Sequence, residues 1–185
     1  MGATILNSLG PLAVLEGSWQ GEDGVDTSPG RDGAVESRYR EQLSFTAIAP
    51  VESGSQTLYG LRYSTTAWPL DAEDPFHEES GYWLWDAHAE QVMRCFMVPR
   101  GVTILAGGST KADSGSFSMR AEVGSDTFGI LSNPYLDREF KTVCYELQVD
   151  IHDDNSFSYE EDTQLKIRGI NEVFHHTDRN RLIRV

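Results

Sequence analysis

The chain has 185 residues, of which 39% are hydrophobic and 24% charged, and this composition is typical of a globular protein. No shift in composition divides the chain, so we expect a single domain over residues 1–185. The 29 acidic residues outnumber the 15 basic ones, giving a formal charge of −14 that repels phosphate backbones and anionic lipids. The charge therefore argues against nucleic acid and membrane surfaces as partners.

The first residues, MGATILNSLGPLAVLEGSW, carry no positive charge and are interrupted by Gly10, Pro11 and Gly17. They fit neither a signal peptide nor a membrane span. Cys95 and Cys144 lie in apolar, strand-like runs without CxxC spacing, which indicates buried, reduced thiols rather than a metal or redox site. Together these features predict a cytoplasmic protein.

Along the chain, apolar residues recur at every second position far more often than at helical spacing, which predicts strands. Strands are expected in 39–47, 58–68, three times within 80–110, and in 116–123, 141–151 and 157–167. Two short strands around a turn are expected in NEVFHHTD and RNRLIRV.

The fold class predicted is therefore all-β: a single antiparallel up-and-down β-barrel of about ten strands. A two-sheet sandwich stays open, because it needs the same alternation of inward and outward residues. The segment LGPLAVLEG is the one helix expected, and it is short enough to cap one end of the barrel.

The histidines show no HExxH spacing, and the chain has no GxSxG, Walker or GxGxxG motif. His88 and His152 fall in turns beside acidic residues, where a solvated role is expected. His175 and His176 are adjacent on a strand, so one ring points inward and the other outward. An inward ring would be neutral and able to bind iron, and Asp178 would hold its second nitrogen. Alternatively, His176, Thr177 and Asp178 form a local network that binds nothing.

One charged residue, Glu41, lies on the apolar face of its predicted strand. Two interpretations stay open: a carboxylate that faces a ligand, or a wall residue satisfied by Arg or Tyr. Trp19, Trp68, Trp83 and Trp85 supply apolar surface wherever they face inward. A barrel of this strand number can hold one small ligand as well as its own side chains.

Several segments together resemble the nitrobindin family of haem-binding β-barrels, which are similar to fatty-acid-binding proteins and lipocalins. LGPLAVLEGSWQGEDG resembles the family's LxxLxGxWxGxG start, YREQLSF resembles its YxExIxF strand, and FHEESGYW resembles its xHxESGY segment. A histidine-bearing C-terminal end follows at a similar interval, so the resemblance spans nearly the whole chain.

The resemblance implies that His176 is the proximal ligand of haem iron and that His77, with Phe76, borders the haem on its other side. It implies ferric haem b as the cofactor, reversible nitric oxide binding and isomerisation of peroxynitrite to nitrate. Arg62, Arg100 and Lys166 are candidates for neutralising the haem propionates.

Three functions are compared on this basis. The first is haem binding, with His176 as proximal ligand, Asp178 orienting it, and Glu41, His77 and Phe76 around the pocket. The second is a haem-free carrier of a fatty acid or another apolar metabolite, whose polar head Tyr, Arg and Glu41 would fix. The third is a barrel filled by its own aromatic residues that serves only in protein contacts. A homodimer stays open in each case.

Overall fold

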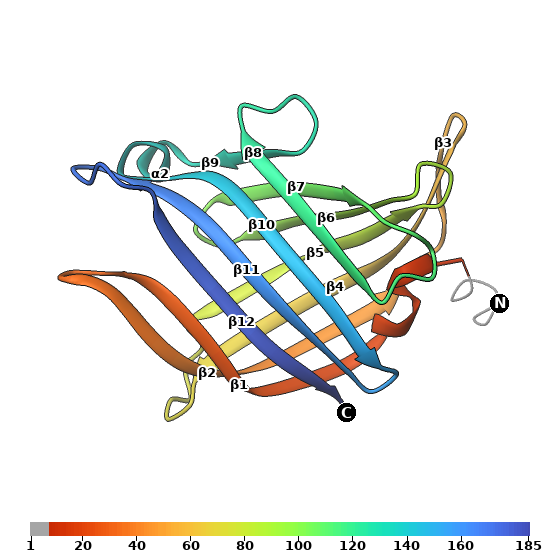
Figure 1. Ribbon diagram of the computed structural model, residues 1–185, viewed down its shortest axis with the longest axis horizontal. Coiled ribbons are helices and arrows are strands. Elements are labelled where there is room, and N and C mark those ends of the chain that lie inside the picture. Colours follow the sequence, from red (N-terminus) through yellow and green to blue (C-terminus); the bar gives the residue numbers. More distant parts are fainter. Residues whose placement is uncertain (1–7) are drawn as a thin grey trace.

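The computed structural model describes residues 8–185, and its strands form one continuous sheet (Figure 1). The signal-peptide prediction rests partly on residues 1–7, which lie outside the described part. The elements in chain order are η1 (Gly10–Leu15), β1 (Gly17–Gly30), β2 (Gly33–Ala47), β3 (Val51–Ser53), β4 (Gln56–Pro69), β5 (His77–Asp86), β6 (Gln91–Val98), β7 (Val102–Ser109), β8 (Ser116–Val123), β9 (Gly129–Ser132), α2 (Pro134–Glu139), β10 (Phe140–Asp153), β11 (Ser156–Ile167) and β12 (Phe174–Arg184).

The sheet closes on itself, which confirms the predicted barrel and rules out the sandwich. Its twelve strands follow the order β2-β1-β12-β11-β10-β8-β9-β7-β6-β5-β4-β3, and β2 also pairs with β4. Because β3 pairs with β4 alone, eleven strands make up the wall. Neighbouring strands are antiparallel except for β8 and β9, which meet in parallel over a short stretch because β9 is inserted between β8 and β7.

Two strand predictions are corrected by the structure. The two short C-terminal strands are one, β12, because it pairs with β11 from Leu165↔Phe174 to Ser156↔Ile183 without interruption. The sequence analysis also omits β1, whose Gly-, Asp- and Pro-containing sequence hides a strand that pairs with both β2 and β12. A bulge between Gly21 and Gly24 breaks its alternation.

The predicted N-terminal cap is the 3₁₀-helix η1, which lies at the end of the barrel opposite α2 (Figure 1). Leu9, Leu12 and Leu15 are fully buried there. The indole Nε1 of Trp19 donates a hydrogen bond to the carbonyl of Leu15 at 2.7 Å. At Gly10, where φ is +56°, a Cβ would lie 2.5 Å from the Trp85 ring, so this position needs glycine. The helix therefore closes one end of the barrel with an apolar plug.

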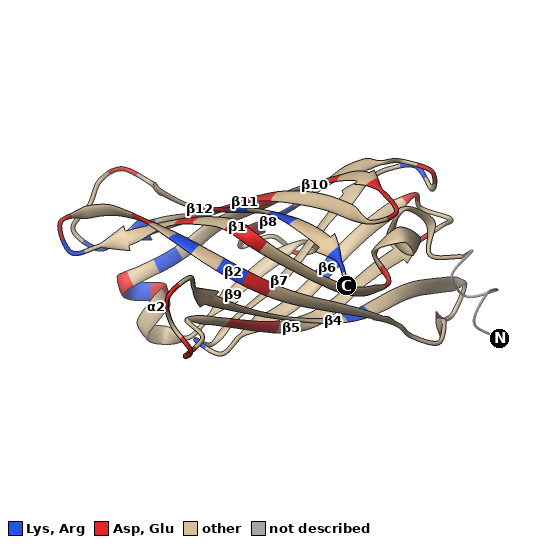
Figure 2. Cartoon of the chain, turned by 90° about the horizontal axis from the view of Figure 1, so that it is seen from below, with Lys and Arg blue, Asp and Glu red and all other residues tan. Residues whose placement is uncertain are grey.

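Within residues 8–185, no helix is both long enough and apolar enough to cross a membrane. Acidic side chains are scattered over strands and turns rather than gathered on one face (Figure 2).

Candidate functional site

A cavity of about 540 Å³ occupies the half of the barrel away from η1. Near its opening the lining is largely apolar, with Phe76, Val98, Tyr135, Leu136, Phe140 and Leu165. The rest of the lining mixes polar side chains with apolar ones such as Leu43, Trp83 and Phe96, and it comes from strands on all sides of the wall. The cavity shows that the barrel is not filled by its aromatic residues, which contradicts the structural premise of the third function considered from sequence.

All five residues singled out from sequence line this one cavity: Glu41, Phe76, His77, His176 and Asp178. They come from β2, β5, β12 and the segment before β5, so residues distant in sequence converge. The alternation on β12 also decides between the two adjacent histidines. The ring of His176 faces the cavity, whereas that of His175 is 57% exposed outside the barrel and contacts Asp162 at 2.7 Å.

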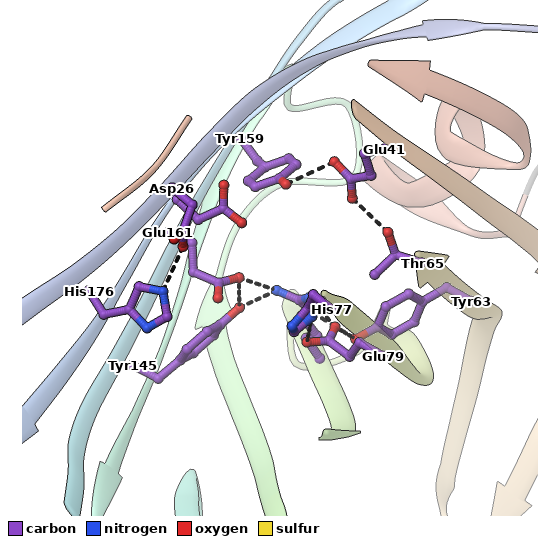
Figure 3. Close-up of polar contacts among 12 residues, drawn as sticks. Asp26, Glu41, Tyr63, Thr65, His77, Glu79, Tyr145, Tyr159, Glu161 and His176 are labelled. Carbon is purple, nitrogen blue, oxygen red and sulfur yellow. Dashed lines mark hydrogen bonds and ion pairs between the residues drawn. The ribbon is translucent and has the colours of Figure 1, made fainter. Parts of the chain in front are cut away.

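The ring of His176 is held by a carboxylate. Its Nε2 lies 2.7 Å from Oδ1 of Asp26 on β1, a side chain that is only 10% exposed (Figure 3). Nδ1 of His176 has no partner among residues 8–185. The sequence analysis expected Asp178 to hold this ring, and the structure corrects it: Tyr39 donates a hydrogen bond to Asp178 instead.

His77 enters the cavity from the other side of the barrel, at the start of β5 (Figure 3). Its Nε2 lies 3.7 Å from Oε2 of Glu79, and its side chain is 36% exposed. Phe76 lies beside it and also contacts Tyr39 edge to face, with ring centroids 5.7 Å apart. Burial lowers the pKa of His77, but the hydrogen bond and charge of Glu79 outweigh burial, so the pKa is raised overall.

A buried arginine organises one part of the polar lining. Arg94 on β6 donates hydrogen bonds to Glu79, to Tyr145 and, at 2.8 Å, to Oε2 of Glu161. Its Nε donates to the hydroxyl of Tyr63 at 3.1 Å. Burial raises the pKa of Glu79, yet the Arg94 charge outweighs this and leaves the pKa lowered. One cation, Arg94, is therefore shared by the two carboxylates of Glu79 and Glu161.

A second polar group in the same cavity has no such cation. Glu41 accepts hydrogen bonds from Thr65 at 2.7 Å and Tyr159 at 2.9 Å (Figure 3). It also accepts one from Asn180 at 3.0 Å, so all three donors are neutral. The hydroxyls of Tyr159 and Tyr39 lie 2.8 Å apart, and Tyr39 also donates to Asp178. Glu41 is therefore satisfied by wall residues that include a Tyr, as one interpretation from sequence expected, and it also lines the cavity. Its contact with a ligand stays a prediction.

Burial favours the protonated form of two carboxyl groups in this cavity, those of Glu41 and Asp178. It raises the pKa of the Glu41 carboxyl despite the three donors. It also raises the pKa of Asp178, and the negative charge of Glu161 adds to the rise. In total five carboxylates line the cavity (Asp26, Glu41, Glu79, Glu161 and Asp178) against two arginines, Arg94 and Arg100. The cavity interior is therefore acidic.

Sequence reasoning missed Arg94, Glu79, Glu161 and Asp26. The pattern that singled out Glu41, a charged residue on the apolar face of a strand, was present for Arg94 as well. Arg94 lies between Val92 and Phe96 on one face of an alternating strand. Asp26 had no such signal, since the strand that carries it was not recognised. Of the three candidates for the propionates, Arg100 lines the cavity, whereas Arg62 and Lys166 are exposed on the outer face.

Comparison with known proteins agrees with this architecture. Residues 8–184 match the model of the THAP4-like, haem-binding β-barrel domain. The chain belongs to this family. Among solved structures it is similar to the crystal structure of Rv2717c from M. tuberculosis, with 20% sequence identity, a TM-score of 0.64, and coverage of 98% of this chain and 97% of that one. No curated protein sequence matches the chain. The nitrobindin-like resemblance read from the sequence is thereby confirmed.

The lining residues fit a haem group. The volume is within the range of small-ligand cavities, about 300–1,000 Å³. Metal-binding histidines commonly have their other ring nitrogen held by a carboxylate, as Asp26 holds His176. The guanidinium of Arg100 makes no ion pair with any residue from 8 to 185, so it is available to a propionate. No cluster of three or more His, Cys, Asp or Glu in the described part is arranged to hold a bare metal ion.

Proposed function

We propose that this barrel binds ferric haem b in its cavity, with His176 as the axial ligand. The observation that carries the proposal is the imidazole of His176, which faces a cavity of about 540 Å³ and is held there by a buried carboxylate, Asp26. Membership of a haem-binding family supports the same ligand.

The other lining residues have separate tasks in this proposal. Arg100 would pair with a propionate, and the apolar side chains of Phe76, Phe140 and Leu165 would contact the ring. His77, with Phe76, would border the haem from the part of the wall across the cavity from His176. Since the core of ferric haem carries a positive charge, the surplus of carboxylates favours the ferric over the ferrous state.

When bound, haem supplies an iron centre that can take nitric oxide as a ligand. The acidic interior does not repel nitric oxide, because that molecule is uncharged. It repels the peroxynitrite anion, because Asp26, Glu79 and Glu161 contribute negative charge. We therefore propose that the haem-loaded protein binds nitric oxide, and we expect it to isomerise peroxynitrite only slowly.

The second candidate, a fatty-acid carrier, has weaker support. The guanidinium of Arg94 is already bonded to Glu79 and Glu161, so a carboxylate head group placed there would have to displace one of these ion pairs. The other arginine of the lining, Arg100, is the one that the haem proposal assigns to a propionate.

The test is a titration with haemin followed by its visible absorption. The wild type is expected to give a saturable Soret shift, which His176→Ala abolishes. His175→Ala is the matched control, because it removes the adjacent ring on the outside of the same strand. A shift that survives in His176→Ala disproves the ligand assignment, and its absence from the wild type disproves haem binding.

A cytoplasmic location and a single domain over residues 1–185 stay proposals as well. Cell fractionation and limited proteolysis test them, with a soluble fraction and one protected fragment as the expected results.

A further inference from the structure

We propose that the tip of the β1–β2 hairpin, residues 28–37, is a flap that closes over the opening of the cavity once a ligand is inside. The inference rests on the proposed haem site, because it describes how that site would admit and keep its ligand. The supporting observations are the pairing of the hairpin, the character of its inner face and its connection to Asp26.

The flap is attached to the rest of the barrel at one end only. β1 pairs with β12 as far as Thr27↔Thr177, and β2 pairs with β4 from Tyr39↔Pro69 onward. Beyond these points, among residues 8–185, the two strands pair only with each other. Figure 1 shows the hairpin diverging from β12 toward its tip. A two-stranded ribbon is marginally stable by itself and twists more than a wider sheet does, so the flap can move without breaking the pairing of the barrel wall.

The inner face of the flap carries no charged side chain. Residues paired across the two strands share a face and alternate with their neighbours, so this face is the one that Asp26 begins and that points into the cavity. The flap residues on it are Ser28, Gly30, Gly33, Val35 and Ser37. Glu36 and Arg38 lie on the outer face of the hairpin. The flap therefore presents small, uncharged side chains to the opening, as a cover for an apolar ring requires.

Part of this inner face is left uncovered. Val35 points inward but is 48% exposed, whereas the inward side chains of Tyr39 and Phe45 further along β2 are buried. At other parts of the opening, Tyr135 and Phe140 line the cavity and are exposed as well. Removing such apolar surface from water is favourable. Closure of the flap onto a bound ring would bury it, so a ligand in the cavity favours the closed position.

The flap also adjoins the residue that holds the axial histidine. Asp26, whose carboxylate lies 2.7 Å from Nε2 of His176, comes one residue before the last pair of β1 with β12. Ser28 and Pro29 follow that pair and line the same cavity. Movement of the flap is therefore transmitted through a short stretch of backbone to the carboxylate that orients the imidazole.

The first experiment measures the position of the flap by pulsed EPR. Spin labels are attached to Ala34→Cys on the outer face of the flap and to Arg138→Cys on α2, a helix that also borders the cavity. Cys95→Ser and Cys144→Ser remove the native thiols. In the control pair, Glu52→Cys on β3, at the end of the barrel opposite α2 (Figure 1), takes the place of the flap label.

Before haemin is added, we expect two distances or one broad distribution between the flap and α2, and with haemin a single shorter distance. A distribution that bound haemin leaves unchanged, or an equal change in the control pair, would overturn the proposal. If no Soret shift appears, haem binding itself is disproved, and the distribution without haemin decides about the flap. Two positions then support a mobile flap, and one narrow distance overturns it.

Two variants test the inner face of the flap. Val35→Ser should speed the release of haemin about tenfold, because the closed flap then loses an apolar contact with the ring. Ala34→Ser introduces the same polar side chain on the outer face and should change the release rate less than about twofold. The rate is measured from the decay of the Soret band with a haem scavenger in excess, and circular dichroism confirms that both variants are folded. Release at the wild-type rate in Val35→Ser contradicts the proposal.

Discussion

The two halves of this barrel are built from the same strands but filled in opposite ways. At the η1 end, Leu12 and Leu15 of the helix pack with Trp19 of β1 in the apolar core. In the other half the inward positions hold Glu41, Arg94 and Asp178 around open space. Burying polar and charged groups adds little net stability, whereas burying apolar ones adds much. The difference indicates that the closed end stabilises the fold and the cavity half is retained for a ligand.

The largest effect should follow from breaking the ion-pair group in the cavity half. Arg94→Met leaves the carboxylates of Glu79 and Glu161 buried without a cation, and we expect a loss of about 3–5 kcal/mol in the free energy of unfolding. Urea denaturation measures it. Adding Glu79→Gln and Glu161→Gln to this variant should restore part of the lost stability. If these substitutions restore none of it, the unpaired carboxylates are not the cause of the loss.

At the closed end, the expected loss comes from packing. Leu12→Ala removes a fully buried side chain from the plug and should cost about 2–5 kcal/mol by the same measurement. Haemin affinity should stay unchanged, because Leu12 does not line the cavity. If Leu12→Ala has wild-type stability, or if its haemin affinity changes, then stability and ligand binding are not assigned to different halves of the barrel.

A smaller effect is expected for the carboxylate that holds His176. Asp26→Asn should weaken haemin binding about 10–100-fold, the usual cost of losing the residue that orients a metal-binding histidine. Asp178→Asn serves as the control, because it changes a carboxyl group of the same cavity that does not contact His176. Tighter binding in Asp26→Asn would mean that Asp26 blocks the ring rather than orienting it.

The last prediction concerns the dependence of stability on pH. Because the pKa of Asp178 is raised in the folded protein, the folded state binds more protons than the unfolded one above the usual Asp pKa, and stability falls as pH rises. Asp178→Asn removes this dependence, by up to about 1.4 kcal/mol per pH unit. Urea denaturation at pH 5 and pH 8 should therefore show that the stability of the variant, relative to the wild type, is higher at pH 8 than at pH 5. If this stability difference is the same at both pH values, the pKa of Asp178 is not raised.

The alternation of residues was enough to predict the barrel, the cap and the inward direction of Glu41, because it depends only on neighbours along one strand. It could not show which side chains from different strands meet. Asp178 was therefore given the role that belongs to Asp26, whose position depends on the pairing of β1 with β12. The pairing of Arg94 with Glu79 and Glu161 was hidden for the same reason, since it joins β6, β5 and β11.

The most direct test of haem binding at His176 is a crystal structure of the haemin-loaded protein, with anomalous diffraction recorded at the iron edge. We predict one iron peak beside a ring nitrogen of His176, inside the cavity, with Asp26 still bonded to the imidazole. Iron bound to another residue, or no iron in the cavity, would contradict the account.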